Sequence, residues 1–400
     1  MDLLNKLSSQ LQQDNHKHLL KASAPFVTTL PQTTINDIQG FVSRFFAITH
    51  REKYQKQRQE EYSHEQNNFS AMMSYDFHIS GDRCKLIEVN TNAGGGLFSL
   101  VSEFLHSSAG IRKKPLEENL RAIRSIQDSF CKEYALWSRG NNKNEELKSI
   151  AILDEDLANV YWLPEFQLFK TLFEEKGITV CIADITEAEI VGNKLVIQGR
   201  EIDLVYNRYC DFYLKDERSK VLGEAYEKNY ACFSPNPYEY HLTASKEVLS
   251  HLSLGDQDEI LGITEDDREV LDRFLLKTYL LTEVDDDEIY AKRKKNIFKP
   301  RTFYGSKGVY RGDKISRKKL LELDHNEYLM QELDPPSVIT VDPNSTDIEL
   351  KSPDFKADYR FYTYKDEIFH VACRFFQGQV TNFQAPGSGF VPVNIETVDS

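Results

Sequence analysis

The sequence lacks the features that mark several common classes of protein. Its six cysteines lie far apart, with no C-x-x-C pair and no histidine pair at zinc spacing. We therefore expect free thiols in a reducing compartment, used for packing rather than for chemistry. No stretch of about 18 apolar residues is present, which argues against a membrane-spanning helix. The G-x-x-x-x-G-K-[ST] loop is also missing, so the sequence does not indicate a P-loop NTPase.

Positive charge is in deficit, because 63 acidic residues face 49 basic ones and give a formal net charge of -14. A strongly acidic protein repels phosphate backbones and anionic lipids, so we expect neither a nucleic-acid partner nor a membrane partner. The stretch Met1–Asn15 is polar and shows no basic segment before an apolar run. We therefore expect no secretory signal and a cytoplasmic location. The hydrophobic fraction of 40% over 400 residues is sufficient for two or three domains.

The first 70 residues favour helices. A helix is predicted to open near Thr33 and Asp37, because apolar residues follow at helical spacing. These apolar residues are Ile38, Phe41, Val42, Phe45 and Phe46. The charged run 51–66 is interpreted as a solvated helix face.

Beyond residue 70 the pattern changes several times. Met72–Asn90 alternates with a period of two and predicts a β-hairpin that turns at Ser80–Asp82. Three glycines follow at 94–96, then helices to about Trp137 and a linker at 139–144. From residue 148 the alternation of strands and a helix indicates a small α/β sheet of Rossmann-like character. Its predicted strands are 150–153, 178–182, 194–197 and 202–206, with a helix over 165–176. Residues 240–283 are predicted to be mostly helical, and the remainder is strand-rich.

The predicted hairpin carries a first group of candidate functional residues. Glu88 and Asn90 are two apart and therefore share one face of their strand. A three-residue loop at 81–83 would place Asp76 directly opposite Glu88, with their Cβ atoms about 5 Å apart. Opposed carboxylates repel unless a cation lies between them, and magnesium suits such oxygen ligands. The alternative is an exposed polar face whose register separates the two charges. The other face of the second strand is expected to carry Ile87 and Val89.

A second group lies in the last quarter of the chain. A strand at 297–300 presents Lys299 and leads into a glycine turn at 304–309, which would suit phosphate oxygens or an ordinary hairpin. A strand at 328–333 follows and ends in polar residues. After it come two arginines and an asparagine ahead of a glycine-rich stretch, namely Arg360, Arg374 and Asn382.

The order of these motifs resembles the ATP-grasp superfamily. In that family a phosphate lysine, a lysine strand, a glycine-rich loop, a hinge, arginines and an asparagine precede a carboxylate hairpin that ends in E-x-N. Here the hairpin comes first, at 75–78 and 86–95, and the other elements follow from Lys246 to Gly389. The chain therefore resembles the circularly permuted ATP-grasp proteins related to glutathionylspermidine synthase.

Two further stretches fit the resemblance. Residues 203–208 resemble the substrate-side strand of the domain that precedes the ATP-grasp fold. Residues 235–237 and 244–246 resemble the entry to the first phosphate lysine, although the family often has aspartate where this chain has Ser245. The implied fold is α+β and α/β: a permuted ATP-grasp fold with a Rossmann-like pre-ATP-grasp domain and an N-terminal helical segment. The implied boundaries are 1–70 for the helical segment, 71–145 for the permuted part with the magnesium hairpin, 146–235 for the Rossmann-like substrate domain, and 236–400 for the nucleotide-binding part.

The resemblance also implies roles for individual residues. The magnesium ligands would be Asp76, Glu88 and Asn90. The phosphate-binding residues of ATP would be Lys246, Lys299, Gly305, Ser306, Lys307 and Gly308. The hinge at adenine and ribose would be Gln331, Glu332 and Leu333. The residues facing the transferred phosphoryl group would be Arg360, Arg374 and Asn382. The substrate would meet Arg208 and Asn92, where Arg208 could bind a carboxylate in two hydrogen bonds or form a structural ion pair.

The implied function is an ATP- and magnesium-dependent ligase. The γ-phosphate of ATP would activate a small-molecule or peptide carboxylate as an acylphosphate, and an amine or thiol would attack it. Catalysis of this kind depends on positioning and on charge stabilisation. Two alternatives remain at this point: a kinase-like phosphotransferase of the same fold, and a nucleotide-binding interaction protein with little catalysis.

Overall fold

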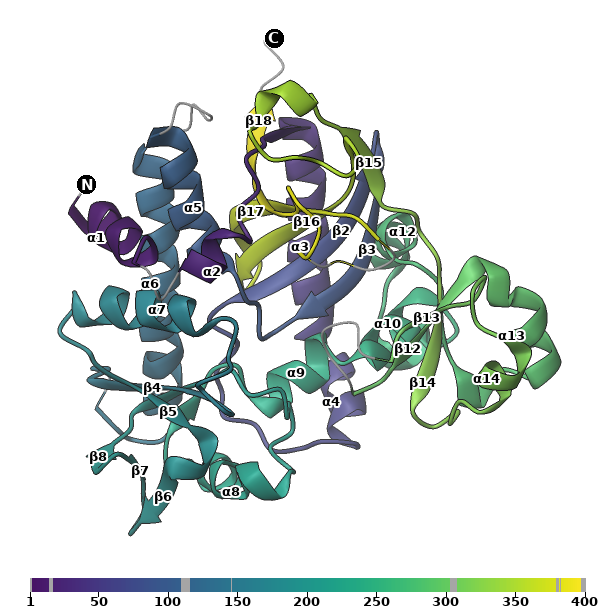
Figure 1. Ribbon diagram of the computed structural model, residues 1–400. Coiled ribbons are helices and arrows are strands. Elements are labelled where there is room, and N and C mark those ends of the chain that lie inside the picture. The colour runs from purple at the N-terminus through teal and green to yellow at the C-terminus, as the bar shows by residue number, and fades with distance from the viewer. Residues whose placement is uncertain are drawn as a thin grey trace.

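The computed structural model describes residues 2–13, 17–108, 116–144, 146–302, 308–378, 381 and 383–396. Four β-sheets and their helices make up this described part of the chain, so the fold is mixed α+β (Figure 1). Among the same residues, no helix combines the length and the apolar character that crossing a bilayer requires.

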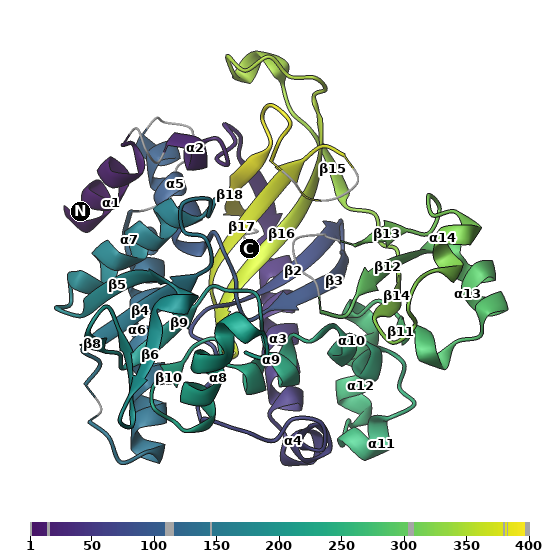
Figure 2. The ribbon, with the colours of Figure 1, turned by 60° about the horizontal axis from the view of Figure 1, so that its bottom comes forward.

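The largest sheet has seven strands and joins the two ends of the chain. Its strands are, in order, β1 (Thr28–Pro31), β18 (Gly389–Glu396), β17 (Glu367–Phe376), β16 (Asp354–Tyr364), β2 (Met73–Ser80) and β3 (Arg83–Asn90), with β15 (Ser337–Thr340) also paired to β16. Only the β1–β18 pair within this sheet is parallel. Because β2 pairs with β16, the early hairpin lies beside strands from the last 50 residues (Figure 2).

The predicted hairpin forms, but its register arises differently from the prediction. Ser80 pairs with Arg83, so the turn has two residues rather than three. That turn alone would place Asp76 opposite Ile87. A bulge beside Asp76 inserts one residue, and Asp76 therefore faces Glu88 after all. Ile87, next to the bulge, lines the cleft described below, and Val89 belongs to the hydrophobic core while also bordering that cleft.

Helices cover both faces of the large sheet. One face packs against α3 (Gln32–Thr49), whose predicted apolar stripe is buried except for Phe46. The other face meets α5 (Gly96–Ser108) and α6 (Leu116–Gly140) near β17 and β18. The remaining N-terminal helices are α1 (Asp2–Leu11), α2 (Lys17–Leu20) and α4 (Glu52–Gln59). The charged run 51–66 was predicted to be solvated, but it is not fully so. Arg58 is buried against His241 and His251.

The second sheet is parallel and has the order β10 (Cys232–Phe233), β9 (Leu204–Asn207), β4 (Ser149–Asp154), β5 (Thr179–Asp184). It packs against α6, α7 (Leu163–Glu174) and α8 (Lys220–Glu227). The predicted strand 194–197 does not extend this sheet. It is β7 (Lys194–Ile197) of a separate antiparallel sheet with β6 (Ala188–Val191) and β8 (Arg200–Glu201).

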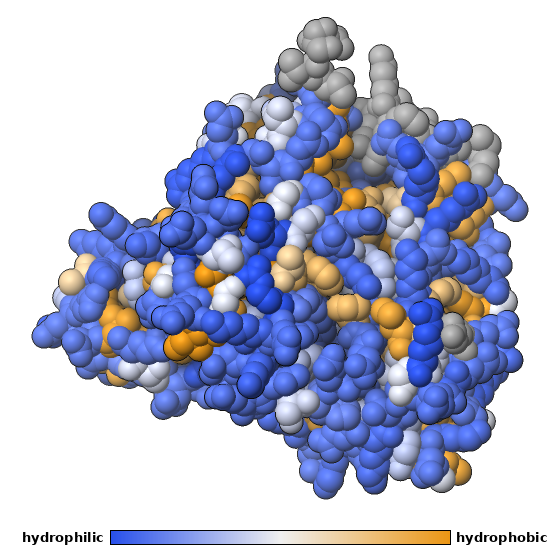
Figure 3. Space-filling view, turned by 180° about the vertical axis from the view of Figure 1, so that it is seen from behind, coloured by the Kyte–Doolittle hydropathy of each residue, from blue (hydrophilic) through white to orange (hydrophobic). Residues whose placement is uncertain are grey.

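The fourth sheet is antiparallel and stands apart from the parallel sheet (Figure 1). Its order is β11 (Thr278–Leu280), β14 (Tyr328–Glu332), β12 (Asn296–Pro300), β13 (Tyr310–Arg311), with α13 (Asp286–Lys292) and α14 (Arg317–Leu321) packed on it. The helices α9 (Pro237–Thr243), α10 (Lys246–Ser253), α11 (Asp258–Leu261) and α12 (Glu265–Phe274) precede this sheet in the chain. The face of the molecule in Figure 3 is mostly hydrophilic, with hydrophobic side chains in separate patches.

Candidate functional site

A cleft of about 1220 Å³ lies where three of the four sheets meet. The large sheet, the parallel sheet and the four-stranded antiparallel sheet each contribute lining residues, among them Asp76, Arg208 and Lys299. The hairpin near the start of the chain and the lysine strand near its end therefore face one cavity, as the sequence predicts.

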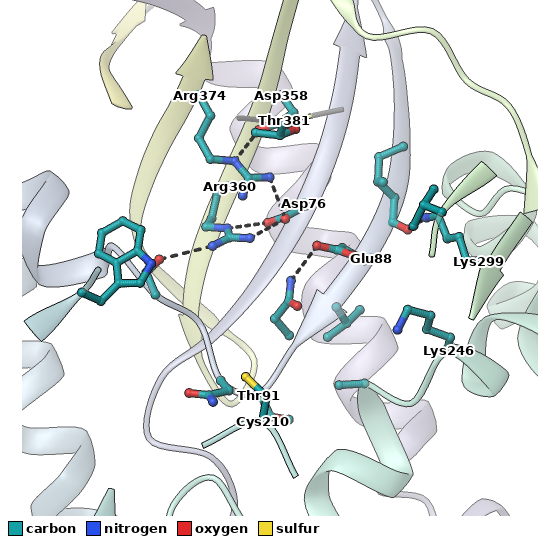
Figure 4. Close-up of a pocket in the computed structure, with 18 of the residues that line it drawn as sticks. Asp76, Glu88, Thr91, Cys210, Lys246, Lys299, Asp358, Arg360, Arg374 and Thr381 are labelled. Carbon is teal, nitrogen blue, oxygen red and sulfur yellow. Dashed lines mark hydrogen bonds and ion pairs between the residues drawn. The ribbon is translucent and has the colours of Figure 1, made fainter. Parts of the chain in front are cut away.

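At the centre of the cleft, four charged side chains of alternating sign are joined by ion pairs (Figure 4). Arg360 donates from Nε and Nη2 to the two oxygens of Asp76, at 2.7 and 2.6 Å. Arg374 donates from Nη2 to Asp76 Oδ2 at 2.8 Å and from Nε to Asp358 Oδ1 at 2.5 Å. The hydroxyl of Thr381 donates to the second oxygen of Asp358 at 2.6 Å. All four charged residues lie across three adjacent strands.

Strand periodicity explains why these charges gather on one face. Asp76 pairs with Arg360 across β2 and β16, and Arg374 pairs with Asp358 across β16 and β17. Side chains alternate between the faces of a strand, so these polar groups project toward the cleft. Their apolar neighbours, such as Phe361, project into the core against α3.

Asp76 is ionised in this setting. Burial opposes its ionisation, but the charges of Arg360 and Arg374 and the hydrogen bonds from Arg360 outweigh burial and hold the pKa of this carboxyl well below its usual range. The two arginines therefore provide the positive charge that a pair of opposed carboxylates requires. The prediction instead gives this role to a magnesium ion, with Asp76 as one of its ligands.

Glu88 and Asn90 face the cleft beside these four charged side chains. Asn90 Nδ2 donates to Glu88 Oε1 in a long hydrogen bond of 3.4 Å. Over the described ranges, no three His, Cys, Asp or Glu side chains cluster as a metal site would require. A divalent cation here would therefore need oxygen atoms from its ligand in addition to Glu88 and the Asn90 amide.

Two lysines approach Glu88 from the opposite wall (Figure 4). Lys299, on β12, donates from Nζ to Gln331 Oε1 at 2.7 Å and to the Ile87 carbonyl at 3.2 Å. Burial lowers the pKa of Lys299 to about 8, although the charge of Glu88 acts in the opposite direction. Burial also lowers the pKa of Lys246, again opposed by Glu88. Lys246 begins α10, and its Nζ donates to the Arg301 carbonyl at 3.5 Å.

The predicted hinge residues do not all face the cleft. Leu333 lines it, whereas Gln331 turns toward Lys299 in a small adjoining pocket. Glu332 is exposed, and its carboxylate accepts from the Lys277 amide at 3.3 Å. Gly308 has φ of +71°, a conformation that favours glycine, and lies next to Tyr328 and Pro300. The other predicted residues of the glycine turn and the predicted asparagine lie outside the described residues: Gly305, Ser306, Lys307 and Asn382.

Arg208 and Asn92 lie together at the other end of the cleft. The guanidinium donates to the Asn92 side-chain oxygen, to the Ala93 carbonyl at 3.3 Å and to the Tyr206 hydroxyl at 3.4 Å. Asn92 Nδ2 donates back to the Arg208 carbonyl at 3.2 Å. Within the part of the chain that is described, Arg208 forms no ion pair, although the sequence allowed one.

Several site residues were not predicted. Asp358 and Thr381 position Arg374, and the Gly94 carbonyl accepts from Arg360 Nη1 at 3.2 Å and from the Tyr362 hydroxyl at 2.9 Å. The alternation of Asp358, Arg360 and Tyr362 along one strand was the feature of the sequence that could have indicated these residues. Their partners lie far away in sequence, so that feature identified a polar face without identifying its contacts.

The fold and the cleft together define a mixed α+β protein whose two chain ends meet at a charged cavity. No protein-family profile matches the chain, and no curated protein matches its sequence. Among solved structures it is similar to a glutathione synthetase-like effector from Globodera pallida in its apo form, with a TM-score of 0.56 and 12% identity over 99% of this chain and 96% of that chain. A candidate gamma-glutamylcysteine synthetase from Methylobacillus flagellatus KT has a TM-score of 0.48 and 10% identity over 90% and 87% of the two chains. The first likeness shows that this chain shares the fold of a glutathione synthetase-like protein.

Proposed function

We propose that this protein is an ATP- and magnesium-dependent carboxylate–amine (or thiol) ligase with a circularly permuted ATP-grasp fold. The observation that carries the proposal is the shared cleft. Glu88 from the early hairpin faces Lys246 and Lys299 from the later half of the chain, and all three line it. The order of motifs in the sequence and the likeness to a glutathione synthetase-like protein support the same proposal.

The charges of the cleft suit a triphosphate. Lys246 and Lys299 would contact phosphate oxygens as point charges. The buried position of Lys299 strengthens that contact, because few water molecules screen it. Leu333 would contact the adenine or ribose, since it lines the cleft directly after β14.

Glu88 and Asn90 fit a magnesium ion. A carboxylate and an amide oxygen supply the hard oxygen ligands that this ion prefers, and the phosphates would complete its shell. When bound, magnesium neutralises charge that develops on the phosphate oxygens. Asp76 has a different part in this proposal, because both of its oxygens already accept hydrogen bonds from arginines. It would hold Arg360 and Arg374 in place.

Arg360 and Arg374 would stabilise the transferred phosphoryl group and the activated acid. Each guanidinium is fixed by at least two hydrogen bonds, so little reorganisation is required when charge develops. The acid would form an acylphosphate, and an amine or thiol would displace phosphate from it. Arg208 would hold a substrate carboxylate, because its charge lacks an ion pair within the described residues.

The test is ADP release with magnesium, ATP and a panel of acids and acceptors. Glu88→Gln keeps the size of the side chain but removes the charge, and we expect it to abolish substrate-dependent ADP release. The matched control is Glu367→Gln, an exposed position at the start of β17. Undiminished turnover in the Glu88 variant would defeat the assignment. Product mass separates ligation from simple phosphorylation, and magnesium–ATP binding without ADP release would favour an interaction protein.

A further inference from the structure

Gly94 lines the cleft between Arg208 and Trp162, which also line it. A Cβ atom at this position would lie 3.0 Å from Arg208 Nη2 and 4.0 Å from Trp162 Cε2. Because glycine has no side chain, a cation and an indole can both come close to the backbone here. Arg360 and Tyr362 both donate to the Gly94 carbonyl, so this end of the cleft adjoins its charged centre.

Aromatic side chains form one wall of this part of the cleft. The Trp162 ring packs edge-on against two buried rings, Phe98 and Phe390, at centroid distances of 6.1 and 6.2 Å. These contacts fix the indole from behind while it still lines the cleft. Tyr161 lines the cleft next to it and is 44% exposed.

A buried positive charge lies on the other side of Gly94 from this aromatic wall. Arg208 is only 8% exposed, and its guanidinium stacks near the Phe166 and Tyr206 rings at 5.9 and 5.3 Å. Its hydrogen-bond acceptors among the described residues are neutral oxygens rather than carboxylates. A buried guanidinium without a carboxylate partner favours an anion, and a carboxylate matches its geometry.

We infer that the acid substrate is an aromatic carboxylic acid. Its carboxylate is held by Arg208, and its ring lies in the cleft and packs on Trp162. Flat rings pack on indole more favourably than other apolar groups of similar size. This inference rests on the proposed ligase function, because it assigns the acid that the ligase activates.

Intrinsic fluorescence can test the inference directly. The chain has two tryptophans, and the other one, Trp137, is 1% exposed with its indole N–H donating to Asn229 at 3.3 Å. Titration of the full-length protein with phenylacetate should give a saturable change in fluorescence. We expect Trp162→Phe to abolish that change and Trp137→Phe to retain it. Acetate should bind at least about tenfold more weakly, since it lacks the ring.

A steric variant tests the place of the acid. Gly94→Ala would put a methyl group 3.0 Å from Arg208 Nη2, so the guanidinium must shift, and we expect phenylacetate binding by calorimetry to weaken at least about tenfold. The control is Gly40→Ala on α3, where a Cβ meets no atom within 4 Å. Magnesium–ATP binding is measured on the unmodified protein, Trp162→Phe, Trp137→Phe and Gly40→Ala, and should be the same for all four. If Gly94→Ala does not fold, the comparison of phenylacetate with acetate on the unmodified protein decides alone.

The outcomes separate this inference from the proposed function. Intact magnesium–ATP binding with no saturable response to phenylacetate overturns the aromatic acid and leaves the nucleotide site standing. Equal affinity for acetate and phenylacetate, or full binding by Gly94→Ala, also overturns it. Loss of magnesium–ATP binding in the unmodified protein would instead remove the proposed function on which the inference depends.

Discussion

Replacing Asp76 by asparagine tests the charge arrangement at the centre of the cleft. Asp76 is 1% exposed and accepts three short hydrogen bonds from Arg360 and Arg374. The amide of asparagine keeps the size of the side chain, yet it removes the negative charge and turns one acceptor into a donor that faces an arginine. Two largely buried guanidinium groups then repel each other with no anion between them.

Removal of one partner from a buried ion pair costs about 3–5 kcal/mol, because the remaining charge is left uncompensated. Asp76 serves two arginines, so we expect Asp76→Asn to lower the free energy of unfolding by about 4–5 kcal/mol at pH 7. Urea denaturation measures this, followed by circular dichroism with the slope of the transition compared between variants. The control Asp366→Asn lies at the exposed tip of the β16–β17 hairpin and should stay within about 0.5 kcal/mol.

Two further measurements sharpen the test. The pKa of Asp76 is depressed in the folded state, so its contribution is complete above the unfolded pKa of about 4 and disappears only as pH falls through the folded value. The stability gap between the two proteins should therefore be constant from pH 5 to 7 and close in strong acid. Adding Arg360→Met to Asp76→Asn should recover part of the loss, since Asp76 is the carboxylate partner of Arg360 and one unpaired charge is removed. If the free energy of unfolding of Asp76→Asn alone lies within about 1 kcal/mol of that of the unmodified protein, the reasoning is refuted.

Two other groups give predictions from their pKa values. Burial lowers the pKa of Lys299 to about 8, so the affinity for magnesium–ATP should weaken about tenfold between pH 7 and 9 as the lysine loses its charge. An affinity that does not change with pH would contradict this, and so would the same pH dependence in Lys299→Arg. Burial raises the pKa of Glu133 to about 7, although a hydrogen bond from Asn68 Nδ2 at 3.1 Å favours its charged form. The contribution of Glu133 to stability is therefore complete below about pH 4.5 and is lost as pH rises through 7. We expect Glu133→Gln to stabilise the protein at pH 8 by on the order of 1–3 kcal/mol, measured by urea denaturation. Equal stability of the two proteins at pH 8 would contradict this prediction.

The irregular segment after α4 shows a role that composition alone misjudged. Its alternate residues Gln66 and Asn68 are buried and bond to the backbone of β10. Gln66 uses its side-chain amide both to donate to the Ala231 carbonyl and to accept from the Phe233 amide. The side chain thus replaces a missing neighbouring strand at the edge of the parallel sheet. From sequence alone, a polar and charged run is interpreted as solvated. The sheet edge that this segment covers is formed by residues about 165 positions later, so the sequence pattern could not predict the contact.

Local patterns in the sequence determined the faces of the elements. Alternation with a period of two predicted the hairpin over 72–90 and separated its polar face from its core face. Helical spacing predicted the buried stripe of α3, and all of it except Phe46 is buried. These properties depend on a few neighbouring residues, so a single sequence contains the information they require.

The tertiary structure alone decided which charges meet. Asp76 and Arg360 are 284 positions apart, and they pair only because β2 enters the sheet beside β16. A bulge next to Asp76 sets Glu88 opposite it, where a regular ladder would have placed Ile87. One residue of slip moves a side chain to the other face of a sheet, so the site depends on strand order and register, which are properties of the folded chain as a whole.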